Sequence, residues 1–325
     1  MERTGLSIRF LTLVEDQIRL VEERMRERVP DHHPDLHAVL AHLISSGGKR
    51  VRPAVALLTG IMLGADQQRL VTLAASIEML HTATLVHDDL IDGALLRRGI
   101  PTVNATWSPA ATVLTGDYIF ARAAELAAQT DSVPVMRTFA ETLAVIVNGE
   151  ITQLFTSRGL SSRENYFQRI YAKTASMFVL AAKSAALISP VDDGVVETMR
   201  DYGYQIGMAF QIVDDILDFV GDQASVGKPV ASDLRQGLVT LPAICYHEAN
   251  PDDPDMQAVL QGQYHNEERM SRLIEAIRQS DAIQQAQQEA REFVLRAQQC
   301  LTHLPDTIER QALHELGDYI IARTT

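Results

Sequence analysis

Two acidic motifs with the same spacing are the residues of this sequence most suited to chemistry. Each is a DDxxD pattern inside an otherwise apolar run, LVHDDLID in the first case and FQIVDDILD in the second. The six carboxylates belong to Asp88, Asp89, Asp92, Asp214, Asp215 and Asp218. A carboxylate that is buried without a partner is strongly unfavourable, so these aspartates need cations or hydrogen-bond donors opposite them.

The spacing within each motif predicts a metal site. In an α-helix, residues four apart lie about 40° from one another, so the first and last aspartate of a motif project from one face. One such motif alone would as readily form an exposed acidic edge, but a second copy on another apolar segment favours bound cations. Carboxylate oxygens suit magnesium, which keeps several waters and often bridges carboxylates to a substrate phosphate. The pair of motifs therefore predicts a magnesium–diphosphate site.

Basic residues accompany the acidic motifs at several points. SSGGKRVRPA places three of them beside paired glycines just before an expected helix, and LLRRG follows the first acidic motif directly. YAKTA and VGKPVASDL supply two more lysines. These residues are Lys49, Arg50, Arg52, Arg97, Arg98, Lys173 and Lys228. The set predicts a site for two polyanions, one held through metal and the other held directly by cationic side chains.

Helices are the elements expected to position these groups. Three long stretches, 135–189, 191–228 and 255–304, contain no proline and are rich in residues with high helix propensity. Apolar residues recur in most of them at spacings of three and four, while no strand-like alternation is sustained. No low-complexity linker or shift of composition divides the chain. We therefore predict an all-α protein with a single domain over residues 1–325.

Composition limits the class of protein and its partners. The chain has 325 residues, 46% of them hydrophobic and 22% charged, which is ordinary for a globular protein. A net charge of −13 argues against nucleic-acid binding, since phosphate backbones favour basic surfaces. The two cysteines, Cys245 and Cys300, fit neither a disulfide framework nor a zinc site. With no signal-peptide pattern and no uncharged apolar run of about 18 residues, we predict a cytoplasmic protein without a membrane span.

The order of these motifs resembles that of the trans-isoprenyl diphosphate synthases, or polyprenyl synthetase family. GGKRVRP stands upstream of DDLID and DDILD, and GKPVASDLRQGLVTLP lies downstream, so the resemblance covers residues from about 40 to 245. It implies a single large bundle of long helices around a deep central cavity, usually as a homodimer. It also implies that isopentenyl diphosphate is condensed with an allylic diphosphate in trans, assisted by up to three magnesium ions. Contact with a membrane would be peripheral, for release of the product.

The resemblance carries roles over to individual residues. All six aspartates match the catalytic motifs, with Asp88, Asp92 and Asp214 as metal ligands. The positions that match contacts to isopentenyl diphosphate are Lys49, Arg52, His81 and Arg98. The positions that match contacts to the allylic diphosphate are Arg97, Lys173, Thr174, Gln211 and Lys228, and both lysines also count as catalytic. Leu238 stands where many members of the family have a lysine, so one supplementary charge is missing.

The implied chemistry follows from charge. Metal and cationic side chains stabilise the departing diphosphate as the allylic C–O bond ionises. The double bond of isopentenyl diphosphate then attacks the allylic cation, and loss of a proton gives a product longer by one five-carbon unit. No side-chain nucleophile is required.

The residues just before Asp88 predict the length of the product. Ala83 and Thr84 lie about 6–8 Å below that ligand, given a rise of about 1.5 Å per residue. Short-chain members of the family commonly carry an aromatic ring there, so two small side chains predict a product of thirty carbons or more. The alternative is a twenty-carbon product, as made by geranylgeranyl diphosphate synthases, with the floor set by Leu80, Ile77 or Phe120.

Two other functions are alternatives to this interpretation. A class I terpene cyclase shares the helical architecture and one DDxxD, but it has no use for GGKRVRP and normally carries a different second motif. A non-catalytic partner subunit would have lost an aspartate motif or its basic residues. If an auxiliary subunit exists, this chain is therefore the catalytic partner.

Overall fold

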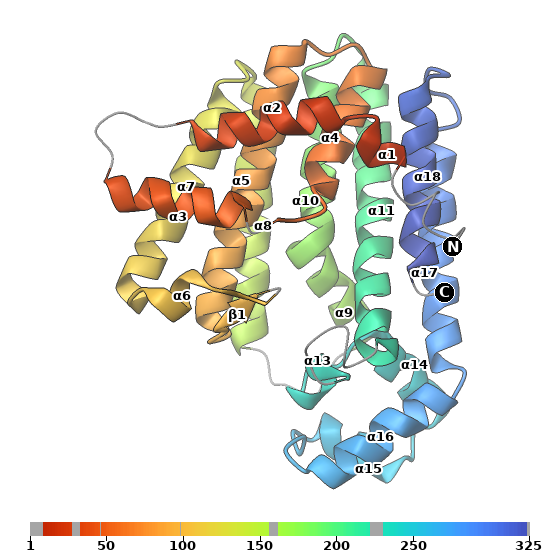
Figure 1. Cartoon of the computed structure of the whole chain (residues 1–325). Coiled ribbons are helices and arrows are strands. Elements are labelled where there is room, and N and C mark those ends of the chain that lie inside the picture. Colours follow the sequence, from red (N-terminus) through yellow and green to blue (C-terminus); the bar gives the residue numbers. More distant parts are fainter. Residues whose placement is uncertain are drawn as a thin grey trace. The chain divides into compact units, whose positions relative to one another are not determined.

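The computed structural model describes residues 9–27, 33–45, 47–97, 99–155, 162–221 and 230–323. Within these ranges the chain is built of helices (Figure 1), which confirms the predicted all-α class. The exception among the described residues is a short antiparallel pair, β1 (Leu96–Arg97) and β2 (Ile100–Pro101), in which Arg97 pairs with Ile100.

The chain forms two compact units. The first comprises Met1–Thr142, Met177–Arg200 and His303–Leu313. The second comprises Leu143–Ser176, Asp201–Thr302 and His314–Thr325. Two long helices, α8 (Val133–Phe155) and α11 (Asp193–Val220), contribute residues to both units. The single domain over residues 1–325 stays a prediction from the sequence.

The first unit is centred on one long buried helix, α5 (Gln67–Ile91). The other helices of this unit are α1 (Arg9–Thr12), α2 (Glu15–Arg26), α3 (Pro34–Ser45), α4 (Val51–Met62), α6 (Val103–Thr106), α7 (Pro109–Ala128) and nearly all of α10 (Ser176–Leu187). Helices α7, α4 and α2 pack against α5 (Figure 1). This packing buries the apolar residues of α5 on more than one side.

Local signals explain where α5 begins and how closely it packs. The Asp66 carboxylate accepts a hydrogen bond from the Arg69 backbone N–H at 2.9 Å, which caps the first turn. A Cβ at Gly116 of α7 would overlap the His87 ring of α5, so the missing side chain lets the two helices approach closely. Among the described helices, α5 is the one with the length and apolarity to cross a membrane, and 78% of its most apolar window is buried within the protein.

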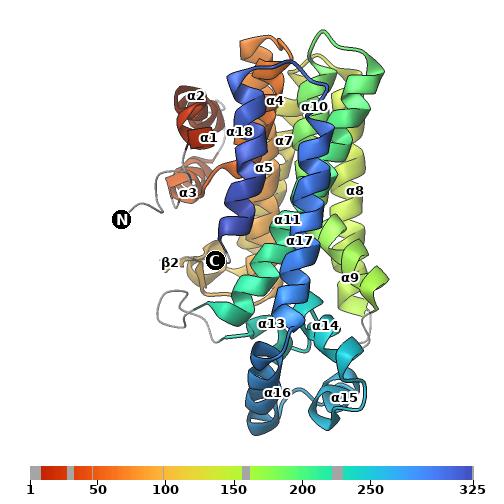
Figure 2. The same cartoon turned by 90° about the vertical axis from the view of Figure 1, so that its right-hand side faces the viewer.

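The second unit contains most of the later part of the chain. Its helices are α9 (Arg163–Ile170), the π-helix η1 (Tyr171–Ala175), α13 (Ser232–Arg235), α14 (Leu241–Ala249), α15 (Pro254–Leu260), α16 (Glu267–Gln279), α17 (Ala282–Cys300) and most of α18 (Ile308–Ala322). Helix α14 packs on α17, and α15 packs on α16 (Figure 2). Arg163 at the start of α9 binds Glu248 of α14 at 2.8 Å and Glu289 of α17 at 2.6 Å. These ion pairs tie α9 to the α14–α17 pair.

Candidate active site

The first aspartate motif lies at the C-terminal end of α5. Asp88 is half-buried, Asp89 is buried with 7% of its surface exposed, and Asp92 is exposed just after the last helical residue. The Asp92 backbone N–H donates to the Asp88 carbonyl at 2.8 Å, which continues the helical turn. Asp88 and Asp92 therefore lie one turn apart, as the spacing predicts, while Asp89 is turned into the protein.

Asp89 is held by an arginine from the short hairpin that follows. Arg97 Nε donates to the two Asp89 oxygens at 2.9 and 3.0 Å, and Nη2 lies 2.8 Å from Oδ1. Contact of a guanidinium with both oxygens of a carboxylate is among the strongest ion-pair geometries, and it compensates the burial of Asp89. The assignment of Arg97 to the allylic diphosphate stays a prediction, because in this structure its partner is Asp89.

The second aspartate motif lies near the end of α11. Asp215 is buried, with 4% of its surface exposed. The Tyr166 hydroxyl of α9 donates to Oδ2 at 2.8 Å, and Gln211 Nε2, one turn earlier on α11, donates to Oδ1 at 2.7 Å. Burial raises the pKa of Asp215 to about 7, and nearby Asp233 raises it too, whereas Gln211, Tyr166 and Arg169 oppose the shift. The middle aspartate of each motif is thus buried and bound by protein donors.

The π-helix η1 extends this hydrogen-bond network. The Thr174 hydroxyl donates to Gln211 Oε1 at 2.6 Å, which fixes the amide with its Nε2 toward Asp215. Turns of π-helix are frequent at functional sites. The neighbouring Lys173 is 42% exposed, and its Nζ lies 3.0 Å from Glu150 Oε1 of α8. The structure thus brings together Thr174 and Gln211, which the sequence assigned to one substrate.

The outer aspartates of the second motif have partners from later in the chain. Arg323 Nη2 lies 2.7 Å from Asp214 Oδ1, and the same guanidinium lies 5.0 Å from the centroid of the Phe210 ring. Asp218 accepts hydrogen bonds from the Ser232 backbone N–H at 3.1 Å and from its hydroxyl at 2.9 Å. Asp218 therefore stabilises the start of α13, while Asp214 forms an ion pair with Arg323 of the segment that follows α18.

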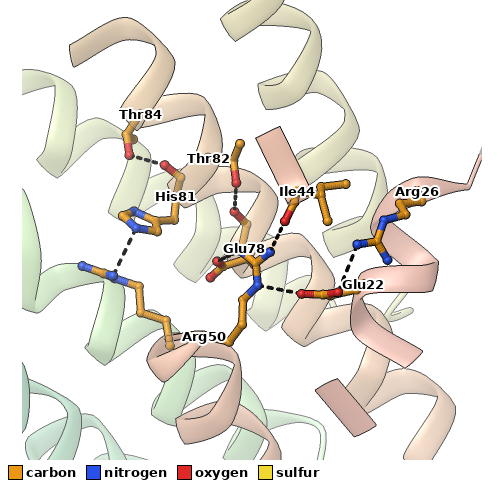
Figure 3. Close-up of polar contacts among 9 residues, drawn as sticks. Glu22, Arg26, Ile44, Arg50, Glu78, His81, Thr82 and Thr84 are labelled. Atoms are coloured by element: carbon orange, nitrogen blue, oxygen red, sulfur yellow. Dashed lines mark hydrogen bonds and ion pairs between the residues drawn. The ribbon is translucent and has the colours of Figure 1, made fainter. Parts of the chain in front are cut away.

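The basic GGKR segment leads into α4. Gly47 has φ +78, a conformation open to glycine, and Lys49 is exposed two residues later. Arg52 is half-buried, with Nη1 3.3 Å from Nε2 of His81 on α5 (Figure 3) and its guanidinium 5.1 Å from the centroid of the Phe178 ring. The structure thus brings together Arg52 and His81, two residues assigned to isopentenyl diphosphate.

The residues expected to set the product length lie deeper on α5. Leu80 and Ala83 have none of their surface exposed. Thr84 is half-buried, and its hydroxyl donates to the His81 carbonyl at 2.7 Å (Figure 3). Leu238, at the position of the family's lysine, is half-buried, and its backbone N–H is hydrogen-bonded. The role of these side chains in product length stays a prediction.

Two of the predicted site residues, Arg98 and Lys228, lie outside the described residues. Within the part of the chain that the structure describes, no three acidic, histidine or cysteine side chains converge as a metal site. The carboxylates of Asp88, Asp92 and Asp214 are half-buried or exposed, unlike the two middle aspartates. Carboxylate oxygens are the donors that magnesium takes, so each of the three side chains suits the predicted metal, and their assignment as its ligands stays a prediction.

Sequence reasoning missed three side chains, two that contact aspartates of the second motif and one that contacts Lys173. Tyr166 and Arg323 are both far from the motifs that they contact, and Glu150 precedes its partner by more than twenty positions. The only sequence signal is indirect: a polar residue within an apolar helical stretch needs a partner. That signal cannot identify which partner it has.

An all-helical fold with two DDxxD motifs and a GGKR loop is that of a trans-prenyltransferase. The chain belongs to the polyprenyl synthetase family, whose model matches residues 33–277. It is 36% identical to the octaprenyl diphosphate synthase of Escherichia coli (strain K12) over 284 residues, which cover 87% of this chain and 88% of that protein.

Two solved structures share the fold over nearly the whole chain. The heptaprenyl diphosphate synthase from Staphylococcus aureus has a TM-score of 0.90 and 32% identity, and the match covers 96% of this chain and 99% of that one. A polyprenyl synthase from Caulobacter crescentus, solved with calcium and isoprenyl diphosphate, has a TM-score of 0.87 and 35% identity, with 98% of each chain covered. These likenesses confirm the predicted family, the fold class and the activity as a prenyltransferase.

Proposed function

We propose that the protein condenses isopentenyl diphosphate with an allylic diphosphate in trans and repeats the step to a polyprenyl diphosphate of thirty carbons or more. The observation that carries the proposal is the repeated DDxxD, in which the middle aspartate is buried against protein donors and the first is left partly accessible. The octaprenyl and heptaprenyl diphosphate synthases among its relatives support a long product.

Magnesium is the proposed metal, with up to three ions and with Asp88, Asp92 and Asp214 among the ligands. The oxygen donor set supports this choice, and the calcium bound by the Caulobacter crescentus relative supports a divalent cation. When bound, the metal stabilises the diphosphate as a leaving group. The contribution of the chain is to fix Asp89 and Asp215 in buried contacts, so that the neighbouring carboxylates keep their direction.

The cationic and polar side chains divide between the two substrates. Lys49, Arg52 and His81 are proposed to hold isopentenyl diphosphate, because a guanidinium can bind phosphate through two parallel hydrogen bonds and a lysine adds charge. Arg98 shares this role by resemblance. The residues proposed to hold the allylic diphosphate are Arg97, Lys173, Thr174, Gln211 and Lys228.

The length of the product is proposed to depend on α5. Ala83 is small and fully buried on the helix that ends in Asp88, and Thr84 follows it. An aromatic ring at Ala83 would occupy space that a growing chain needs. Leu80, one turn deeper, is the residue that would set a floor for a twenty-carbon product instead.

A homodimer is proposed from one face of α8. Val147, Ile151, Leu154 and Phe155 are 45%, 48%, 58% and 86% exposed. They recur at helical spacing, so they form an apolar stripe, and such stripes commonly mark contact with another protein. A second copy of this chain is the proposed partner. Light scattering of the purified protein tests the assembly, and a monomer at micromolar concentration would contradict it.

The domain organisation and the location of the protein are also proposed. One polyprenyl synthetase domain over residues 1–325 is supported by the extent of the family match, residues 33–277. A cytoplasmic location is supported by Cys245 and Cys300, which are both free thiols. Contact with a membrane is proposed to be peripheral and limited to release of the apolar product.

One assay tests the proposed function. The purified chain is incubated with isopentenyl diphosphate, farnesyl diphosphate and magnesium, and the dephosphorylated products are separated by length. A ladder that extends to thirty carbons or more is expected. A product that stops at twenty carbons would indicate a geranylgeranyl diphosphate synthase. Release of diphosphate without use of isopentenyl diphosphate would indicate a terpene cyclase, and activity only with added cell extract would indicate an auxiliary subunit.

A further inference from the structure

The guanidinium of Arg50 is enclosed by three acceptors although its neighbours in the GGKR segment include an exposed lysine. Nε donates to Glu22 Oε1 at 3.1 Å, Nη1 to Glu78 Oε1 at 2.6 Å, and Nη2 to the Ile44 carbonyl at 2.7 Å (Figure 3). The Arg50 side chain is 9% exposed and that of Glu78 is 6% exposed. We call Arg50 with these three partners the Arg50 clamp.

The clamp keeps Arg50 charged and turned away from solvent. Burial lowers the pKa of its guanidinium, but Glu78 and Glu22 outweigh burial and raise the pKa above its ordinary value. All three of its nitrogens donate to acceptors within the protein. Arg50 is therefore committed to the fold and is not available to a phosphate.

The clamp also holds an unfavourable backbone conformation. Arg50 has φ 48° and ψ 34°, in the left-handed region, and it directly precedes α4. This conformation is unfavourable for a residue with a Cβ, and the side-chain contacts of the clamp stabilise it here. Arg50 lies between Lys49 and Arg52, and its backbone angles set the direction of the chain on either side. A relaxed Arg50 would therefore change how these two side chains are placed.

Helix α5 holds this segment at two points. Glu78 and His81 lie three residues apart on α5 and so are neighbours on its surface. Glu78 binds Arg50, while His81 Nε2 lies 3.3 Å from Arg52 Nη1 (Figure 3). The same helix ends in the first aspartate motif. One rigid element thus positions the basic segment and the acidic motif together.

We propose that Arg50 is a positioning residue for the isopentenyl diphosphate site and that Glu22 and Glu78 act through it. The clamp fixes the left-handed turn that presents Lys49 and Arg52. This inference rests on the proposed function, in which those two residues bind isopentenyl diphosphate. Under this proposal, α2 affects the affinity for isopentenyl diphosphate through Glu22, although α2 carries none of the motif residues.

Two substitutions and one control test the proposal. Arg50→Lys keeps the charge, but a lysine has no planar fork and cannot bind three acceptors in the same geometry. Glu22→Gln weakens one contact of the clamp from α2. The matched control is Arg26→Gln, since Arg26 is also on α2 and binds the other oxygen of Glu22 at 3.1 Å, with 41% of its side chain exposed (Figure 3).

The expected result is a selective loss of isopentenyl diphosphate affinity. Misplacement of a binding group by about 1 Å can cost about 100-fold, so we expect about a tenfold rise in KM for isopentenyl diphosphate in Arg50→Lys and about threefold in Glu22→Gln. The KM for farnesyl diphosphate should change by less than about twofold in both, and Arg26→Gln should match the wild type. Calorimetric titration of isopentenyl diphosphate into substrate-free protein should give the same ratios. The double variant should be no worse than Arg50→Lys, because both changes act through one group.

Two results would overturn the proposal. One is an unchanged KM for isopentenyl diphosphate in both variants, and the other is an equal rise in KM for both substrates, which a purely structural role would give. If Arg50→Lys does not fold, Glu22→Gln decides the question alone. A wild-type protein that neither binds nor consumes isopentenyl diphosphate would instead refute the proposed function, and that result is distinct because it needs no variant.

Discussion

Replacement of Tyr166 by phenylalanine tests how Asp215 is held in the second motif. The change removes the hydroxyl that donates to Asp215 Oδ2 at 2.8 Å and keeps the ring. A hydrogen bond to a charged group contributes about 1.5–3 kcal/mol to stability, and one between neutral groups contributes about 0.5–1.5 kcal/mol. The loss of unfolding free energy in Tyr166→Phe should therefore depend on whether Asp215 is ionised.

The direction of this pH dependence follows from the environment of Asp215. Burial raises its pKa from 3.8 to about 7, so the folded protein holds this proton more tightly than the unfolded chain does. The stability that the group contributes is present at low pH and is lost as the pH rises through its folded pKa. The Tyr166 hydroxyl reduces that loss, because it stabilises the carboxylate, and burial keeps the hydroxyl itself protonated by raising its pKa. Without the Tyr166 hydroxyl, the pKa of Asp215 should rise by about one further unit, because one unit corresponds to about 1.4 kcal/mol, close to the energy of the lost hydrogen bond.

Urea unfolding of the metal-free protein at fixed concentration provides the assay. We expect Tyr166→Phe to lose about 1 kcal/mol of unfolding free energy at about pH 5.5 and about 2–3 kcal/mol at about pH 8.5. The control is Tyr202→Phe on α11, the helix that carries Asp215. Tyr202 is also fully buried, and the free energy lost on its replacement should not depend on pH. Equal losses for Tyr166→Phe at both pH values would refute the reasoning, because Asp215 would then not titrate in this range.

Four further changes test the site. Asp88→Ala should lower kcat by more than about tenfold, and near wild-type turnover across a magnesium titration would contradict its role as a metal ligand. Arg52→Ala should raise the KM for isopentenyl diphosphate more than that for farnesyl diphosphate, and equal rises would argue against the division between substrates. Ala83→Phe should shorten the products seen by chromatography while the first condensation continues, and an unchanged distribution would disprove the proposed floor. Arg323→Gln removes the cation 2.7 Å from Asp214, so calorimetry should show tighter magnesium binding without substrate, whereas unchanged affinity would mean that the ion pair does not compete.

The acidic motifs could be predicted from the sequence because their geometry is local. The spacing of Asp88 and Asp92 fixes their relative direction once the segment is a helix, and helix periodicity is visible in the residues themselves. The partners of the aspartates could not be predicted in the same way. Tyr166 and Arg323 reach the second motif from other helices, and no sequence spacing relates residues that meet only through tertiary packing.

Basic residues a few positions apart in the GGKR segment have different roles, one exposed to solvent and another buried in the fold. Lys49, Arg50 and Arg52 all read as cations for a polyanion, yet the structure encloses Arg50 between two carboxylates while Lys49 is exposed. The left-handed backbone at Arg50 and the positions of Glu22 and Glu78 decide this, and none of them is visible in GGKRVRP. The hairpin of β1 and β2 could not be predicted from the sequence, because two-residue strands are too short to show an alternating pattern.

Two carboxylates of the acidic motifs, and one near the predicted allylic contacts, have partners of opposite sign within the protein. The pairs are Asp89–Arg97, Glu150–Lys173 and Asp214–Arg323. Ligand binding at either motif is therefore an exchange of partners. A free diphosphate that bound the basic member of a pair would replace the carboxylate that the member now contacts, and a lone cation at the acidic member would replace its arginine or lysine. A complex of metal with diphosphate brings both signs together and satisfies both members. We therefore expect the resting protein, because of these ion pairs, to favour the complex over either component alone.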